Sequence, residues 1–369
     1  MGYVAVKGGF EAIEHASGLL AYERRKGESR PLEVTQIKEQ LYLAVDRVMG
    51  EGSIYAPDLA ALALKQAAGD PLEAAFMLRA YRATKPRLGY TEFQSTEDMH
   101  VIRRLSAAFK DIPGGQVLGA TADYTLRLLD FELLDDSPAK REAYLKELFN
   151  GLREVDPLPD SFPKVIEVLR RENLLVAGAV AAGGPGGVFD LTRQSITYPA
   201  ARSTALQAMA RGETGGLLLL AYSSMRGYGD IHPTIGELRV GYLPVKVKLP
   251  DGGEPRLVGE VKVTEAEVIA RFTSQDGSPK FTLGYGLCFG HNEIKAISMA
   301  ILDRTMQAPD PKLPCEDQEF VLSHIDGVES MGFCNHWKLP HYVTFQSDLD
   351  RLRKTRAATE TKAPGGDPE

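Results

Sequence analysis

The chain has 369 residues, with 43 Lys and Arg against 50 Asp and Glu, which gives a formal net charge of −7 at pH 7. This balance argues against a nucleic-acid-binding protein, and no apolar run approaches the roughly 20 residues needed to span a bilayer. The length favours two or three domains, and the three widely spaced cysteines suit a reducing compartment rather than a disulfide framework. The first residues lack the layout of a secretory signal. We therefore expect a soluble, cytoplasmic protein whose partners are small molecules or other proteins.

Helical signals dominate residues 1–176, the predicted N-terminal region. Apolar residues recur at helical spacing within residues 37–48 and again within residues 118–134. Asp70-Pro71-Leu72-Glu73 combines an N-cap acid with a proline at the first helical position, and the helix that it opens should end before Pro86. Two further helices are expected, at residues 58–68 and 137–151. This region is predicted to be mainly helical and to make assembly contacts.

Strand signals follow a change of composition at residues 177–190, a Gly-rich stretch predicted to be a linker or mobile loop. Apolar and polar residues alternate within residues 238–249, and the chain returns through residues 257–263, which predicts a β-hairpin with one buried face. Thr264-Glu265-Ala266-Glu267 matches a capping box and predicts a helix. A second helix should begin at Asn292 and run to about Arg304.

The predicted fold class is α+β, in which a helical N-terminal region precedes a mixed region that contains an antiparallel β-hairpin. Residues 191–352 form the predicted catalytic and metal-binding region. The last segment, residues 353–369, is polar and ends near an Ala-Pro-Gly-Gly run, so we expect it to be disordered.

Two of the seven histidines, His336 and His341, stand five residues apart around Pro340. On an ideal helix this spacing separates two side chains by roughly 140°, and Pro340 ends a helix, so the imidazoles can converge only from a turn or loop. Cys334 would add a thiolate, but this set leaves a tetrahedral zinc site one ligand short, so water, substrate or a partner chain has to complete it. The alternative is a pair of surface or hydrogen-bonded histidines without a metal.

Two further segments are rich in groups that bind phosphate. Residues 222–233 place Arg226, Tyr228 and His232 between glycines, although an ordinary structured turn has a similar composition. Residues 284–295 form a glycine-spaced stretch that leads into a helix start, where free backbone amides bind anions. This stretch matches neither a Walker loop nor a dinucleotide fingerprint. The alternative is that its glycines relieve crowding where a strand meets a helix.

Several motifs, taken in chain order, resemble those of one family, and the match is collinear over nearly the whole chain apart from about residues 135–187 and the tail. The matching stretches are residues 3–9, 43–49, 60–67, 110–116, 226–229, 284–287, 319–322 and 338–342. On these residues the chain resembles the PhnI family, the ribose-1-methylphosphonate-5-triphosphate synthase subunit of the bacterial carbon–phosphorus lyase core complex.

The resemblance implies that an alkylphosphonate displaces adenine from MgATP, giving a ribose 1-alkylphosphonate 5-triphosphate for later radical cleavage of the carbon–phosphorus bond. It implies assembly with core subunits G, H and J and with ATP-binding-cassette subunits. It also implies that the isolated subunit is a nucleosidase, which hydrolyses ATP or GTP to the base and ribose 5-triphosphate. By resemblance, His336 and His341 bind zinc together with a cysteine of the radical-SAM subunit J. Cys334 departs from the family pattern, which leaves its place as a ligand open.

Substitution at the anomeric carbon of ribose develops oxocarbenium-like charge, so the site needs a donor for the leaving adenine, a carboxylate near the sugar and cations along the triphosphate. Candidate catalytic residues are His232, Asp303 and Asp326, and candidate substrate contacts are Arg226, Tyr228, Lys295 and Arg304. Asp303 and Asp326 have structural alternatives, as a helix cap and as a loop-holding residue. A second function class is a scaffold subunit that lends His336 and His341 to a shared zinc site, and a weaker third is a metal-dependent hydrolase that acts alone.

Overall fold

The computed structural model describes residues 9–151, 159, 161–176, 189–226, 232–248, 253–273 and 278–360. Residues 177–188 of the predicted linker and residues 250–252 of the predicted hairpin turn, at residues 250–253, lie outside this set. None of the described helices is both long and apolar enough to cross a membrane.

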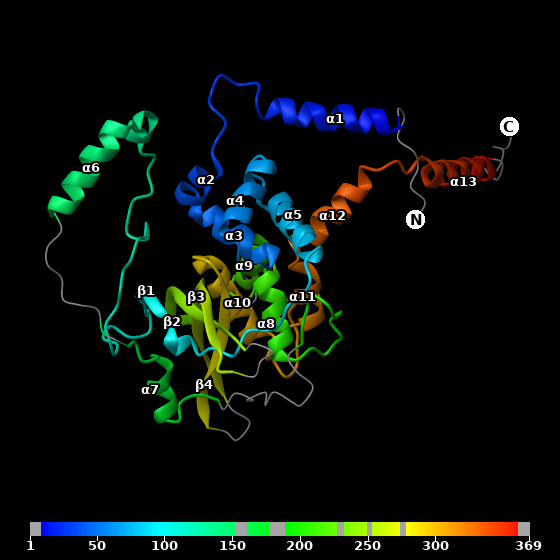
Figure 1. Cartoon of the computed structure of the whole chain (residues 1–369). Coiled ribbons are helices and arrows are strands. Elements are labelled where there is room, and N and C mark those ends of the chain that lie inside the picture. The colour runs from blue at the N-terminus through cyan, green and yellow to red at the C-terminus, as the bar shows by residue number, and fades with distance from the viewer. Residues whose placement is uncertain are drawn as a thin grey trace, which may run out of the picture.

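A four-stranded antiparallel sheet in the order β1-β2-β3-β4 lies at the centre of the molecule (Figure 1). The strands are β1 (His100–Leu105), β2 (Thr234–Val247), β3 (Arg256–Thr273) and β4 (Pro279–Phe289). The predicted hairpin is confirmed, since β2 pairs with β3, and β4 extends the sheet beyond β3. β1 comes from the N-terminal region and pairs with β2, so the sheet is built from both halves of the chain.

The helix predicted from Thr264 is wrong, because residues 264–267 lie inside β3. In the register, Thr264 faces Val240 of β2 on one side and Cys288 of β4 on the other, so the backbone of β3 is paired along both edges. Residues 264–267 match the sequence motif of a helix N-terminus. An inner strand, however, has hydrogen-bonded backbone N–H and C=O groups along both edges, whereas the first N–H groups of a helix lack backbone partners. The predicted helix after Asn292 is confirmed as α10 (Glu293–Thr305).

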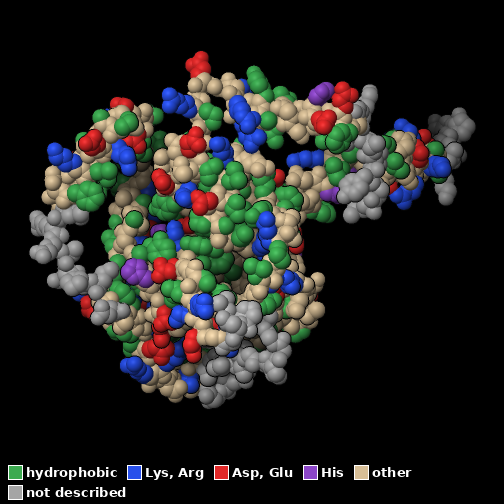
Figure 2. Space-filling view, in the orientation of Figure 1, with side chains coloured by type: hydrophobic (Ala, Val, Ile, Leu, Met, Phe, Trp, Pro, Cys, Tyr) green, Lys and Arg blue, Asp and Glu red, His purple; other side chains and the backbone are tan. Residues whose placement is uncertain are grey.

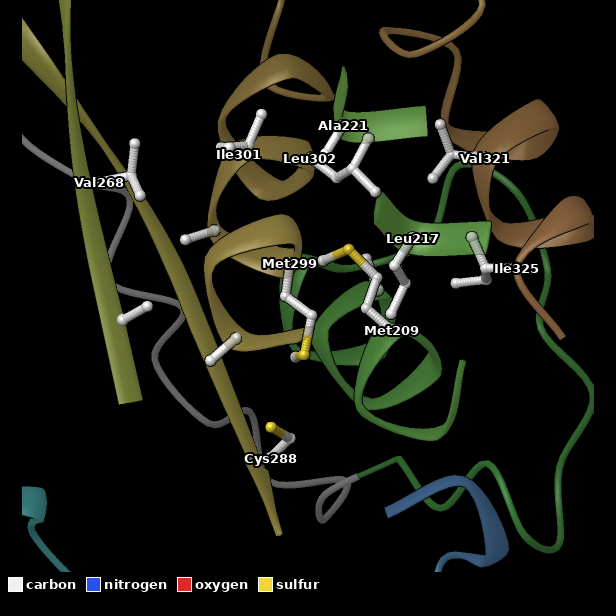
Figure 3. Packing of buried hydrophobic residues seen from close by; sticks show 14 of the residues in the cluster. Met209, Leu217, Ala221, Val268, Cys288, Met299, Ile301, Leu302, Val321 and Ile325 are labelled. Atoms are coloured by element: carbon white, nitrogen blue, oxygen red, sulfur yellow. The ribbon is translucent and has the colours of Figure 1, made fainter. Parts of the chain in front are cut away.

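The main core lies between α10, the sheet, and the helices α8 (Arg202–Arg211), α9 (Thr214–Ser223) and α11 (Gln318–His324). Figure 3 shows Met209 and Leu217 meeting Met299 and Leu302 of α10, with Val268 of β3 on the other side of α10. These side chains are almost completely buried. α10 therefore contacts both the sheet and the outer helices, and it is the central helix of the second half.

A second core joins the N-terminal helices α2 (Val34–Gln40), α3 (Tyr42–Gly52), α4 (Pro57–Gln66) and α5 (Pro71–Ala83). The predicted cap is confirmed: the carboxylate of Asp70 accepts hydrogen bonds from the backbone N–H groups of Leu72 and Glu73 at 2.9 and 3.2 Å. The helix ends at Ala83, before Pro86 as predicted.

Three helices extend away from these cores and bury no residue of their own: α1 (Gly9–Glu23), α6 (Pro138–Gly151) and α13 (Tyr342–Glu360) (Figure 1). Large apolar side chains are exposed on them, including Phe10, Phe149 and Phe345, and Figure 2 shows hydrophobic groups on the visible faces of α1 and α6. The smaller elements are α7 (Ile166–Arg171), α12 (Gly327–Trp337), η1 (Thr96–Asp98) and η2 (Phe131–Asp135).

Two sequence predictions fail in these extended parts. Residues 118–134 show helical apolar spacing, yet the only helical turn that the structure describes there is at the start of η2, and their leucines are exposed. A helix without a surface on which to bury its apolar face gains little stability. The segment predicted to be disordered is helical as far as Glu360, within α13. Ion pairs one turn apart, such as Arg353 with Asp350, support this exposed helix.

Several side chains tie the N-terminal helices to the second half, among them Arg47 through Glu213, Asp46 through Lys262, and Arg79 on α5. The guanidinium of Arg79 contacts three other elements. Its Nε donates to the carbonyl of Glu51 at 2.8 Å, and Nη2 donates to the carbonyl of Arg211 at 3.1 Å. Nη1 bonds both carboxylate oxygens of Asp326, at 2.8 and 2.7 Å. Arg79 therefore holds together the ends of α3 and α8 and the start of α12.

Replacing Arg79 with Met should lower the free energy of unfolding by about 3 kcal/mol, because Asp326 loses its nearer cation, keeping only Arg211 at 3.7 Å, and two carbonyls lose their donors. Urea denaturation followed by circular dichroism measures this loss. The exposed Arg170, which pairs with Glu167 on α7, supplies the control variant Arg170→Met, which should keep the wild-type midpoint. Equal midpoints for the two variants would show that Arg79 does not hold the junction.

Candidate functional site

The imidazoles of His336 and His341 converge as the sequence predicted. His336 lies in the last turn of α12, the chain turns at residues 338–340, and His341 precedes the first residue of α13. Their Nε2 atoms are 3.2 Å apart and the ring planes are nearly perpendicular. Nδ1 of His341 lies 2.6 Å from the carbonyl of Leu339, which can only accept, so Nδ1 carries the proton and Nε2 presents a lone pair.

This imidazole pair fits a zinc ion but does not complete its coordination. Two nitrogens at about 2.1 Å from a tetrahedral zinc lie roughly 3.4 Å apart, close to the observed separation of the Nε2 atoms. Cys334 lies two residues before His336 on α12, and residues at this spacing do not face each other on a helix. In the part of the chain that the structure describes, no third His, Cys, Asp or Glu joins the pair.

A cleft opens where the N-terminal helices meet the sheet. Its inner cavity, of about 240 Å³, is walled by apolar side chains that include Ala210, Leu287 and Phe289. Its outer cavity, of about 360 Å³, is more polar. Leu191 and Arg211 line both cavities, so the two are adjacent and Arg211 stands where they meet.

Arg211 lines both cavities, and Arg79 and Arg82 of α5, which line neither, are near enough to repel its charge. Burial lowers the pKa of Arg82 and of Arg211, and the guanidinium of Arg79 lowers each further by like-charge repulsion. Asp326, a predicted catalytic residue, lines the outer cavity, but its carboxylate pairs with Arg79 and accepts the backbone N–H groups at the start of α12. Asp326 thus serves as the N-cap of α12 and as the partner of Arg79.

The other predicted site residues do not gather in one place. Lys295 and Arg304 lie at opposite ends of α10, roughly 13 Å apart along its axis. Asp303 is buried and accepts hydrogen bonds from Arg202 at 2.8 and 2.6 Å and from the backbone N–H of Tyr285 at 2.8 Å. Asp303 therefore has a structural role, but as the partner of Arg202 and of a backbone donor on β4 rather than as the helix cap predicted from the sequence.

Arg226 and His232 are exposed, the first just after α9 and the second just before β2. Tyr228 lies between them, outside the described residues. Arg226 and His232 are therefore accessible to a ligand, but neither lines the cleft.

The glycines of residues 284–290 serve packing. A Cβ on Gly284 would lie 1.9 Å from the carbonyl oxygen of Ala300, and one on Gly286 would lie 2.1 Å from that of Ala296. Gly290 has a φ of +78°, and a Cβ there would overlap Asp46. These contacts confirm the alternative that glycine allows α10 to approach β4 closely.

A buried ionic network that no sequence pattern indicated lies on the face of the sheet opposite α10. Arg104 donates to Glu237 at 2.6 Å, and Arg239 pairs with Glu265. Lys164 lies 2.7 Å from Glu265 and joins the network from the segment before α7. Each strand β1, β2 and β3 contributes one or more charged side chains to this network.

The two acids on β3 titrate differently. Burial alone would raise the pKa of Glu265, but Arg239 and Lys164 outweigh it and lower that pKa to about 2. Burial and the neighbouring Glu265 raise the pKa of Glu267, despite the charge of Lys164. Burial also raises the pKa of the Tyr285 hydroxyl, which donates to Glu265 at 2.9 Å.

The arginines beside the cleft were also missed, although the sequence holds a faint signal. Arg79 and Arg82 stand one turn apart on α5, whose residues Ala74, Ala75 and Leu78 are buried. Arginine is seldom fully buried unless it is paired, so a charged position on the buried face of a helix indicates a specific partner. The long-range partners themselves cannot be read from the sequence.

The family model and the relatives that resemble this chain all carry names from phosphonate metabolism or C-P lyase. The family model described as "Bacterial phosphonate metabolism protein (PhnI)" matches residues 2–359. A putative C-P lyase subunit protein, HtxH of Stutzerimonas stutzeri, is 55% identical over 363 residues, which cover 96% of each chain. The alpha-D-ribose 1-methylphosphonate 5-triphosphate synthase subunit PhnI of Rhizobium meliloti is 47% identical over 371 residues, 99% of this chain and 97% of its own. The subunit of the same name from Escherichia coli is 47% identical over 358 residues, 95% of this chain and 98% of its own.

The pH dependence of stability should report the charge of Glu265. Because its pKa is lowered in the folded state, Glu265 stabilises the fold above its unfolded pKa of about 4.3, and this stability is lost as pH falls towards 2. The contribution is about 3 kcal/mol, at roughly 1.4 kcal/mol per pKa unit.

Urea denaturation at pH 6, 4.5, 3.5 and 2.5 tests this prediction. Glu265→Gln should be less stable than the wild type at pH 6, and the difference should shrink as pH falls. The exposed Glu172 supplies the control Glu172→Gln, which should follow the wild-type curve. A difference between wild type and Glu265→Gln that stays constant with pH would contradict the assignment.

Proposed function

The chain belongs to the PhnI family of bacterial phosphonate metabolism proteins, and from this premise we propose that it carries the glycosyl-transfer step of its complex. It is a synthase-type subunit of a carbon–phosphorus lyase system, as its relatives are named. The family match along almost the full chain is the observation that carries the proposal, because the alignments with the relatives also cover 96–98% of their lengths.

In the proposed reaction an oxygen of an alkylphosphonate attacks the anomeric carbon of MgATP. The bond from that carbon to adenine breaks, its electron pair goes to the base, and a proton is delivered to adenine. The product is ribose 1-alkylphosphonate 5-triphosphate. In the isolated chain, water takes the place of the phosphonate, so ATP or GTP yields the free base and ribose 5-triphosphate. We place this ATP-using chain in the cytoplasm.

The predicted roles of the site residues stay proposals. His232 is the candidate acid for the leaving base and Arg226 a candidate phosphate contact, and both are exposed. Asp303 pairs with Arg202, and Asp326 pairs with Arg79. Either carboxylate would therefore have to break its ion pair before it could act near the sugar.

Zinc at the imidazole pair is the second part of the proposal. His336 and His341 would hold the ion, which would stabilise a contact between subunits rather than the fold of this chain. The Nε2 separation and the orientation of His341 support this, and so does the exposed position of the pair beside α13. A cysteine of the radical-SAM subunit J is the proposed further ligand.

The extended helices suit a multi-subunit assembly. α1, α6 and α13 bury nothing within this chain, and exposed apolar surface of this extent is typical of interaction sites. We propose that they contact the core subunits G, H and J and the ATP-binding-cassette subunits. The exposed apolar surface of these helices also favours the second function, that of a scaffold subunit whose main contribution is two zinc-binding imidazoles, those of His336 and His341.

Release of adenine from MgATP separates the two functions. The full-length chain alone should release adenine and ribose 5-triphosphate, and with methylphosphonate and the partner subunits it should yield ribose 1-methylphosphonate 5-triphosphate. Liquid chromatography with mass spectrometry measures both products. The scaffold alternative predicts no adenine from the chain alone and full activity in a complex that lacks it.

Zinc content of the assembled complex tests the imidazole pair. His336→Ala and His341→Ala should each reduce bound zinc severalfold, and should leave adenine release by the isolated chain unchanged, because the pair lies at the other end of α12 from Asp326. Cys334→Ser, on another face of α12, is the control and should keep the zinc. Full zinc occupancy in both histidine variants would contradict the site.

A further inference from the structure

We propose that the cleft binds the purine nucleoside triphosphate, with the base in the inner cavity and the phosphates beside Arg82 and Arg211. The identity of the nucleotide rests on the proposed function. Its location is argued from the cavities of this chain and from buried polar atoms that lack a partner.

The dimensions of the cleft suit a ligand with two dissimilar ends. Sites for small molecules commonly measure roughly 300–1,000 Å³ and often lie where two structural units meet. The cavities of about 240 and 360 Å³ share Leu191 and Arg211, so an elongated ligand can occupy both. The inner cavity is such a place, since Gly50 and Ser53 from the N-terminal helices line it together with Ala210 and Cys288 from the second half.

The inner cavity matches a purine. Apolar side chains, among them Ala210, Leu287 and the ring of Phe289, supply walls for a flat aromatic group. Ser53 also lines this cavity, and its Oγ is buried without a hydrogen-bond partner among the described residues. An unpaired hydroxyl in a mainly apolar cavity, which Thr192, Gln207 and Arg211 also line, fits the polar edge of a base.

The arginines supply the anion end. Nε of Arg82 and Nε of Arg211 are both buried and without a hydrogen-bond partner in the described part of the chain. Asp326 is shared between Arg79, at 2.7 Å, and Arg211, at 3.7 Å, and burial outweighs the nearby acids in lowering the pKa of Arg82 and of Arg211. An anion between them would satisfy both donors and relieve their mutual repulsion. Phosphate binds well to such forked donors.

The carboxylates near the phosphate end have roles of their own. Asp326 is held as the cap of α12 and by Arg79, so it does not oppose the ligand with a free charge. Glu329, which is exposed and lines the outer cavity, suits the Mg²⁺ that accompanies a nucleoside triphosphate.

Lys295 lies behind the inner cavity. A Cβ on Gly50, which lines that cavity, would stand 3.4 Å from its Nζ. This Nζ is buried and has no hydrogen-bond partner among the described residues. Lys295 therefore belongs at the base end of the cleft, which differs from the phosphate contact predicted from the sequence.

Equilibrium dialysis of the full-length chain with labelled ATP tests the phosphate end. Arg82→Ala and Arg211→Ala should each weaken ATP binding roughly ten- to hundredfold, through loss of a charge-assisted hydrogen bond, and should leave adenosine binding unchanged. Arg171→Ala, an exposed arginine at the end of α7, is the control and should bind ATP as the wild type does. ATP affinity that is unchanged in both cleft variants would overturn the inference, as would an equal loss in the control.

A second pair of variants tests the base end. Ala210→Phe should fill the inner cavity and weaken adenosine and ATP at least tenfold, yet keep the binding of inorganic tripolyphosphate, whereas Ala210→Ser should change neither. Loss of tripolyphosphate but not adenosine in Ala210→Phe would overturn the placement of the base.

Adenine release measured on the same proteins separates this inference from the proposed function. If the wild type and both arginine variants release adenine equally and bind ATP equally, the cleft is not the site, while the function stands. If the wild type binds ATP in the cleft as described but releases no adenine, even with its partners, the function fails and the site remains.

Discussion

At the junction of the N-terminal helices with the second half, which the ion pairs Arg47–Glu213 and Lys262–Asp46 also bridge, several elements meet at the guanidinium of Arg79. It binds the carbonyls of Glu51 and Arg211 and the carboxylate of Asp326, so four elements, α3, α5, α8 and α12, meet at one side chain. A buried ion pair gives little net stability compared with apolar packing, but removing one partner is costly. The ion pair of Arg79 with Asp326 therefore favours one arrangement of the two cores. The shape of the cleft between them depends on that arrangement.

α12 connects this junction to the imidazole pair. Its N-cap is Asp326, beside the cleft, and His336 lies in its last turn. Eleven residues of helix span roughly 16 Å, so the two places are separate but joined by a rigid element. A partner subunit that binds at His336 and His341 would thereby act on the residue that holds Arg79. Assembly can therefore influence nucleotide binding through α12, although the cleft and the imidazole pair share no residue that takes part in chemistry.

The sequence predicted features whose causes are local. Asp70 and Pro71 define a helix start within four residues, and Pro340 forces the break that lets His341 face His336. The sequence did not predict features that depend on contacts with residues far away in the chain. Residues 264–267 have the letters of a helix cap, yet β2 and β4 pair with them from both sides. The roles of Asp303 and Arg79 depend on residues about one hundred or more positions away, which no spacing along the chain reveals.

The central claim is that this chain binds the nucleotide in its own cleft and the metal at its exposed imidazole pair. The most direct test is a structure of the assembled complex with Mg²⁺ and an ATP analogue whose ribose is replaced by a carbocycle, so that the bond to adenine stays intact. The account predicts adenine against Phe289, phosphates at Arg82 and Arg211, and a metal ion between His336 and His341. A nucleotide bound elsewhere on this chain, or on another subunit alone, would contradict it.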